Sequence, residues 1–161
     1  MDGERYVLYY CVPSRIPLHS NWGKGVRSMN RGECEYLFTT SFYSVSGAMG
    51  ILDRKVRTMA AARQPVMICG EEGTGKEQIA RFLYLNSPLS HKPFVTVNCE
   101  LMNEKSWDFL FNNDNSPLNG AGNTVYFQNL EAVTEERGME LLALIQETGL
   151  ARRVRLIFSS A

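Results

Sequence analysis

The sequence predicts a single α/β domain in which helices flank a parallel β-sheet. From Val66 onward, apolar runs of strand length alternate with segments of helical period, which is typical of βα units. A glycine-rich segment follows the first of these strands and precedes a helical segment. The chain has 161 residues, of which 44% are hydrophobic. This length suffices for one buried core but not for two full domains.

Four apolar runs are the predicted strands: Val66–Cys69, Phe94–Val97, Val125–Phe127 and Val154–Phe158. The predicted helices are Ile51–Arg63, Glu77–Leu85 and Glu135–Thr148. Since an uninterrupted apolar run is typical of a strand covered on both faces, we expect the Val66–Cys69 strand to be buried. In the last helix we expect Met139, Leu142 and Ile145 to form the apolar face, and Gly149 to end the helix.

Residues 1–44 differ in character from residues 45–161, and we treat them as an N-terminal segment of unknown function. Two aromatic runs, Arg5–Val12 and Cys34–Phe42, flank a stretch rich in Pro, Gly and Ser. We interpret the two runs as a hairpin-like pair or as strands added to an edge of the sheet. No function is predicted for this segment.

The charge balance excludes several classes of protein. The chain has 17 basic and 17 acidic side chains, so the sequence has neither a polybasic arm for nucleic acid nor an acidic tail. No apolar run approaches the roughly 20 residues that span a bilayer, and the first residues lack the pattern of a signal peptide. We therefore predict a cytoplasmic protein with no membrane partner.

The cysteines predict buried free thiols and no metal site. They are widely spaced, form no CxxC pair and lie far from His19 and His91. Zinc sites need clustered ligands, which this spacing does not provide. The four cysteines are Cys11, Cys34, Cys69 and Cys99.

The strongest motif directly follows the Val66–Cys69 strand and fits the pattern GxxxxGK. Its residues are Gly70, Glu71, Glu72, Gly73, Thr74, Gly75, Lys76 and Glu77. Such a loop turns backbone N–H groups inward at a helix N-terminus, and its lysine meets the terminal phosphates of a nucleotide. Glu77 stands where the strict motif has Ser or Thr for Mg²⁺. Glycine-rich turns also occur without a ligand, but the lysine and the flanking elements favour a phosphate site.

The sequence resembles the central AAA+ domain of bacterial sigma-54-dependent transcriptional activators, also called enhancer-binding proteins. Their phosphate loop typically reads GESGTGKE, against GEEGTGKE here. Lys92–Cys99 is similar to the family pattern KPFVxVNC, and Val154–Ile157 to its VRII strand. The resemblance covers about residues 45–161. It implies a P-loop NTPase sheet of AAA+ type, a role in transcription regulation, ATP or ADP as ligand, and related activator subunits as partners.

The sequence departs from the family at the strand that carries the hydrolysis residues. The family reads GGTLFLDE where Gly122–Asn129 reads GNTVYFQN, so Gln128 and Asn129 replace an acidic pair. Amides are neutral, so they neither balance Mg²⁺ nor accept a proton. The resemblance therefore implies weakened Mg²⁺ binding and no fast hydrolysis. Asn98 resembles the asparagine that holds the family's glutamate. Glu131 is the alternative base, although we interpret it as a solvated carboxylate at a helix start.

Two further departures concern partners. Trp107–Phe111 resembles the start of a family helix, but residues 112–121 form a polar surface turn cluster without the family's GAFTGA loop. This argues against a sigma factor contact. The sequence ends with Ala161 at the family's sensor I asparagine, before any lid or DNA-binding motif. The basic residues Arg152, Arg153 and Arg155 are interpreted as solvated strand edges.

These observations support a regulatory module that binds ATP or ADP without efficient turnover. Three alternatives stay open. The chain could be a nucleotide-independent interaction module with a vestigial loop, or a fragment of a longer activator. It could also be a working NTPase with a displaced base or one supplied by another subunit.

Overall fold

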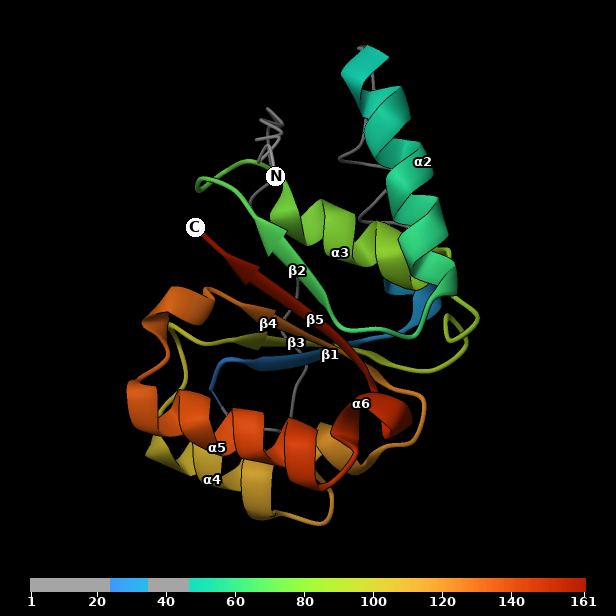
Figure 1. Cartoon of the computed structure of the whole chain (residues 1–161). Coiled ribbons are helices and arrows are strands. Elements are labelled where there is room, and N and C mark those ends of the chain that lie inside the picture. Colours follow the sequence, from blue (N-terminus) through green and yellow to red (C-terminus); the bar gives the residue numbers. More distant parts are fainter. Residues whose placement is uncertain (1–23, 35–46) are drawn as a thin grey trace.

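The computed structural model describes residues 24–34 and 47–161, which form a sheet with helices on both faces (Figure 1). The five strands follow the order β1-β3-β4-β5-β2. Their bounds are β1 Val26–Met29, β2 Val66–Cys69, β3 Phe94–Asn98, β4 Thr124–Gln128 and β5 Arg155–Ser160. The last four strands are parallel, as predicted.

The helices divide between the two faces of the sheet (Figure 1). One face carries α2 (Gly47–Ala61) and α3 (Lys76–Leu85). The other face carries α4 (Glu104–Asn112), α5 (Glu135–Glu147) and α6 (Leu150–Arg153). Two short 3₁₀ turns, η1 (Pro117–Asn119) and η2 (Leu130–Ala132), flank β4 in the sequence. The predicted α/β fold is confirmed, with helix bounds shifted by a few residues.

Two apolar cores form because successive strand residues point to opposite faces of the sheet. Phe94, Tyr126 and Ile157 lie in the core beneath α2 and α3. Val95, Val125 and Leu156 lie in the core against α4, α5 and α6. Both faces of the central strands are thus covered, which explains why the sequence shows continuous apolar runs there instead of alternation.

Strand β1 was not predicted, and it runs antiparallel to β3. Val26 pairs with Val97 and Met29 pairs with Phe94. The four residues are too few, and Arg27 and Ser28 too polar, for a strand signal in the sequence. The sheet therefore takes one strand from the residues before 45. Of the two predicted aromatic runs, Arg5–Val12 lies outside the described residues. The second run, Cys34–Phe42, is described only at Cys34.

Strand β2 forms an edge of the sheet, and the prediction that it is covered on both faces is wrong. Among the described residues β2 pairs with β5, while Met67 is 51% exposed and Cys69 is also exposed. The helices α4, α5 and α6 lie over the other strands (Figure 1), so they leave this side of β2 open. Cys34 and Cys99 are buried free thiols, as predicted, whereas the prediction of a buried thiol is wrong for Cys69 because β2 is an edge strand; Cys11 lies outside the described residues.

Helix α5 packs through a face that shares only Ile145 with the predicted one, and the prediction is wrong for Met139 and Leu142. Met139 is 62% exposed and Leu142 is 44% exposed, whereas Leu141 is buried. Leu144 and Ile145 are partly buried and pack against the same core as Leu141. The apolar residues of this helix spread around its circumference, so their spacing alone does not select the buried stripe. Gly149 follows the helix with a positive φ of 65°, as its predicted stop requires.

Arg155 is buried, and its interpretation as a solvated edge residue is wrong. Its Nη2 donates to the Met59 carbonyl at 2.8 Å and its Nη1 to the Ala60 carbonyl at 3.5 Å. These carbonyls belong to the last turn of α2, where helix geometry leaves C=O groups without internal partners. Arg152 and Arg153 are exposed, and they lie on α6 and not on a strand. A long-range contact therefore sets the position of Arg155.

The polar segment after α4 is only partly a surface turn, contrary to the prediction. Leu118 and Ser116 in this segment are buried. The Ser116 hydroxyl donates to the Leu110 carbonyl and accepts from the Leu118 N–H at 3.2 Å. Because Ser116 satisfies these backbone groups, the turn can carry Leu118 into the core.

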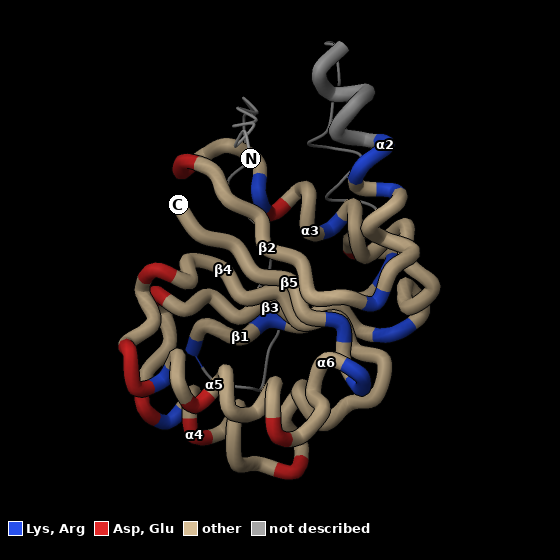
Figure 2. Tube along the Cα trace, in the orientation of Figure 1, with Lys and Arg blue, Asp and Glu red and all other residues tan. Residues whose placement is uncertain are grey.

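Charges are unevenly distributed over the described residues. Figure 2 shows carboxylate-bearing residues along α4 and α5, and basic residues along α2 and at α6. No helix among the described residues is long and apolar enough to cross a membrane.

Candidate phosphate-binding site

The loop between β2 and α3 has the geometry of an anion-binding turn. Gly73 and Gly75 have φ values of 76° and 80°, in the left-handed region that favours glycine. Gly75 is the N-cap of α3, so the loop passes directly into the helix. The Thr74 hydroxyl donates to the Glu71 carbonyl at 2.6 Å, which fixes the turn from within. The backbone N–H groups of the first helical turn therefore face the loop.

Lys76 is the first residue of α3 and lies inside this loop. Its ammonium group donates to the Gly70 carbonyl and, at 2.9 Å, to the Glu71 carbonyl. The positive end of the helix dipole lies beside this charge. The two together make the loop electrostatically suited to an anion.

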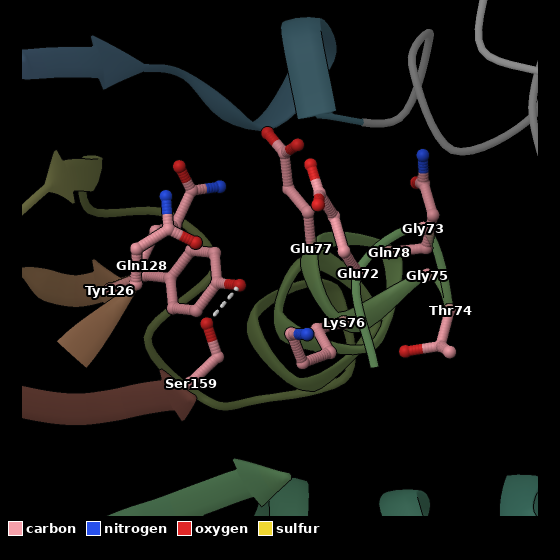
Figure 3. A pocket seen from close by; sticks show the side chains of 11 residues that line it. Glu72, Gly73, Thr74, Gly75, Lys76, Glu77, Gln78, Tyr126, Gln128 and Ser159 are labelled. Atoms are coloured by element: carbon pink, nitrogen blue, oxygen red, sulfur yellow. Dashed lines mark hydrogen bonds between the residues drawn. The ribbon is translucent and has the colours of Figure 1, made fainter. Parts of the chain in front are cut away.

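A pocket of about 230 Å³ joins the loop to the carboxyl ends of β4 and β5. Its lining residues are Glu72, Gly73, Thr74, Gly75, Lys76, Glu77, Gln78, Tyr126, Gln128, Asn129 and Ser159. Figure 3 shows Gln128, Tyr126 and Ser159 on one side of this pocket and the loop residues on the other. The structure thus brings most of the predicted loop together with Gln128 and Asn129.

The wall opposite the loop is neutral. The Tyr126 hydroxyl lies 2.9 Å from the Ser159 hydroxyl, and both residues are 1% exposed. Burial raises the pKa of Tyr126 above its ordinary value, against the opposing effect of the Ser159 hydrogen bond. The phenol is therefore protonated at neutral pH. Gln128 and Asn129, at the end of β4, add uncharged amides to this wall.

Asn98 and Asn129 join the ends of two neighbouring strands. The Asn129 Nδ2 donates to the Asn98 Oδ1 at 3.1 Å and to the Glu100 Oε2 at 3.5 Å. Asn129 has a positive φ of 55°, which asparagine adopts more readily than most residues. The structure therefore places Asn98 in contact with the residue at the family's glutamate position. The adjacent Glu100 was not considered in the sequence analysis.

Glu77 is paired with a buried arginine. Its Oε1 accepts from the Arg81 Nη2, and the Arg81 side chain is 4% exposed. Arg81 also donates to the Gln78 Oε1 at 3.3 Å. The carboxylate at the position of the strict motif's Ser or Thr is therefore already neutralised within α3.

Glu131 lies outside the residues that line the pocket. Its Oε2 accepts from the Ser160 hydroxyl at 3.0 Å and from the Ala161 N–H at 3.3 Å. A hydrogen bond from its own backbone N–H, with smaller contributions from Ser160, Ala161 and Lys76, lowers the pKa of Glu131. The carboxylate is exposed, in keeping with its interpretation as solvated, but it also ties η2 to the end of β5.

The sequence analysis missed the hydroxyl pair in the pocket. Tyr126 precedes Gln128 by two residues on β4, so strand alternation points both side chains to the same face. Ser159 lies near the carboxyl end of β5, where parallel strands of such sheets present their ligand-binding residues. Both signals are in the sequence, but each depends on knowing that β4 and β5 are neighbours.

Comparison with known proteins identifies the family of this chain. The family model of the Sigma-54 interaction domain matches residues 43–154. The transcriptional regulatory protein ZraR of Escherichia coli (strain K12) is 31% identical in an alignment of 120 residues that covers 66% of this chain and 27% of ZraR. The Nif-specific regulatory protein of Rhodobacter capsulatus is 29% identical in an alignment of 115 residues that covers 63% of this chain and 20% of that protein.

Among solved structures, NtrX from Brucella abortus in complex with ATP is similar to this chain, with a TM-score of 0.66. The match covers 74% of this chain and 32% of the NtrX chain, at 24% sequence identity. The alignments span about a quarter of the length of the curated relatives. Because the family match covers most of the chain, including the loop, β4 and α5, the assignment does not rest on the phosphate loop alone. The chain belongs to the family of Sigma-54 interaction domains found in transcriptional activators.

Proposed function

We propose that this domain binds ATP or ADP through Gly70–Glu77, hydrolyses it poorly if at all, and acts as a regulatory module in transcription. The observation that supports this proposal most directly is the pocket, in which Lys76 and its loop lie opposite the amides of Gln128 and Asn129. The NtrX structure with bound ATP supports this ligand for the shared fold.

The neutral wall accounts for the proposed loss of hydrolysis. A carboxylate next to the terminal phosphate polarises the attacking water and accepts its proton, and such groups contribute about 10²–10⁴-fold in rate. The amides of Gln128 and Asn129 accept no proton at neutral pH. Glu131 does not replace them, because its carboxylate accepts hydrogen bonds at the end of β5.

We further propose that residues 45–161 form the nucleotide-binding domain and that related activator subunits are its partners. The family match over residues 43–154 supports this division. Strand β1 then belongs to the sheet of the domain although it precedes this range. The nucleotide would stabilise the folded domain by mass action and could select one state for docking.

Calorimetric titration of the full chain with ATP and with ADP tests binding. We expect saturable binding that the Lys76→Ala variant weakens at least tenfold. Lys105→Ala is a matched control, because Lys105 is exposed on α4, away from the pocket residues. An absence of binding at millimolar nucleotide, with the same thermal unfolding curve in Lys76→Ala, would reject the proposal and favour the nucleotide-independent module.

A steady-state phosphate-release assay tests the loss of hydrolysis. We expect the unaltered chain to release no more phosphate than Lys76→Ala. The double variant Gln128→Asp, Asn129→Glu should gain turnover if the acidic pair is what the site lacks. Release by the unaltered chain that disappears in Lys76→Ala would instead identify a working NTPase with a base from elsewhere.

A further inference from the structure

The strand ends of this pocket do not fit a magnesium ion. Mg²⁺ in nucleotide sites is held by one or two carboxylates together with water and phosphate oxygens. The corresponding wall holds Gln128 and Asn129, and the Asn129 nitrogen donates to Asn98 and Glu100. An amide brings no negative charge to offset that of the metal. These side chains therefore offer neutral carbonyl oxygens but none of the negative charge with which nucleotide sites hold the ion.

Glu77 and Glu72 are the carboxylates that do line the pocket. Glu77 accepts from Arg81, whose side chain is 4% exposed. If Glu77 turned to a metal ion, it would leave a buried guanidinium without its carboxylate partner, which is costly. Glu72 is exposed on the loop between β2 and α3. The Glu77 carboxylate is thus engaged within its own helix.

The wall presents hydrogen-bond donors and neutral amide oxygens where a nucleotide-bound metal site would present carboxylates. One hydroxyl of the pair formed by Tyr126 and Ser159 donates to the other, so one O–H hydrogen remains for another acceptor. The Gln128 amide carries two further N–H donors. Lys76 and the other residues at the start of α3 line the pocket opposite this wall, and helix geometry leaves N–H groups there for an anion. Donors on both sides suit phosphate oxygens directly.

We propose that the pocket holds the phosphates of ATP or ADP by these donors alone, without a divalent cation. This inference rests on the nucleotide binding proposed above and specifies its form. Lys76 supplies the positive charge, and the N–H groups of the loop and of the helix start donate to the phosphate oxygens. Gln128 donates to the same phosphates from the end of β4. The form bound is the free nucleotide, and its terminal phosphate lies against Gln128.

The test compares ATP binding by the full chain in EDTA and in magnesium chloride at equal ionic strength. We expect the two dissociation constants to agree within threefold. Tightening by Mg²⁺ of more than threefold would overturn the inference while leaving nucleotide binding intact. If no ATP binds in either buffer, the nucleotide proposal itself fails and the inference falls with it. If Mg²⁺ tightened ATP binding by the unaltered chain but not by the Glu77→Gln variant, the metal would be assigned to Glu77.

An isosteric charge change gives a second readout. Gln128→Glu places one negative charge against the phosphates, so we expect at least fivefold weaker ATP binding in EDTA and recovery when Mg²⁺ is added. Gln146→Glu is the matched control, since Gln146 is exposed on α5 and does not line the pocket. Unchanged binding of Gln128→Glu in EDTA would show that this wall does not meet the phosphates and would overturn the inference.

A milder variant keeps the test valid if Gln128→Glu fails to fold. Ser159→Ala removes a hydroxyl from the pair with Tyr126, and we expect about threefold weaker ATP binding in EDTA. Ser160→Ala is its neighbour control, because strand alternation points Ser160 to the other face and its hydroxyl bonds to Glu131. Equal affinities of the two variants in EDTA would contradict the proposed donor role of this wall.

Discussion

The Asn129 side-chain amide donates to the Asn98 Oδ1 at 3.1 Å and thereby links the carboxyl ends of β4 and β3. Asn129 makes this contact from a left-handed backbone conformation, with φ 55° and ψ 52°. The same conformation starts η2, which carries the chain away from the pocket. Asn129 therefore forms the strand-end link and also contributes one of the neutral side chains of the pocket wall.

Substitutions at Asn129 separate its hydrogen bond from its backbone conformation. Alanine and glycine both remove the bond, but only glycine adopts a positive φ without strain. We expect Asn129→Ala to be less stable than Asn129→Gly by about 0.5–1 kcal/mol. Urea denaturation at neutral pH measures the difference. An alanine variant as stable as the glycine variant would contradict the left-handed conformation.

Arg155 should contribute strongly to stability, because its guanidinium bonds to the last carbonyls of α2 from a buried position. We expect Arg155→Ala to lower the free energy of unfolding by about 2–3 kcal/mol, the scale of hydrogen bonds to a charged group. Arg152→Ala, at an exposed position on α6, should stay within about 0.5 kcal/mol of the unaltered chain. Chemical denaturation of both variants tests this, and equal effects would exclude the buried contact.

The packed face of α5 can be tested by paired truncations. Leu141 is 4% exposed, so Leu141→Ala should leave a cavity and cost about 2–5 kcal/mol. Met139 is 62% exposed, so Met139→Ala should change stability by less than about 0.5 kcal/mol. Thermal and urea unfolding measure both. The reverse ranking would support the face that the helical spacing first suggested.

Two buried thiols predict a loss of stability in alkali. Burial raises the pKa of Cys34 and that of Cys99 from 9.0 to about 12. Above about pH 9 the unfolded thiols release protons that the folded state keeps. The stability that these two thiols permit is therefore fully present below that pH, and the free energy of unfolding falls as the pH rises toward 12.

Urea midpoints at pH 7.5, 9 and 10 measure this decline. In a Cys34→Ala, Cys99→Ala variant the decline should be shallower, although the variant starts from a lower midpoint. Lysines and tyrosines also titrate in this range. The test therefore compares the slope of urea midpoint against pH in the unaltered chain with the slope in the double variant. Identical slopes would show that the thiols do not contribute.

Local patterns predicted the parallel strands and the phosphate loop. The loop could be predicted because its residues are contiguous, and glycine spacing, lysine and flanking elements all lie within one segment. The strands from Phe94 and Val125 could be predicted because both faces are covered and the runs are therefore continuously apolar. The resemblance then aligned Gln128 and Asn129 with the acidic pair of the family.

Features set by distant contacts could not be predicted in this way. Arg155 is buried because the end of α2 lies beside it. Its partner there, Met59, is 96 residues earlier in the sequence. Met67 is exposed because β2 lies at an edge, which depends on the order of the strands. Ser159 meets Tyr126 only when β4 and β5 pair. In each case the deciding neighbour is far away in the sequence.

The position of β1 has a practical consequence for work with shortened forms of this protein. A version trimmed to begin at residue 43, where the family match starts, would lack the strand that covers the outer edge of β3. The backbone N–H and C=O groups of Thr96 and Asn98 on that side would then be open to pairing with other molecules, a known route to aggregation. A soluble short version should therefore retain the residues from Lys24 onward.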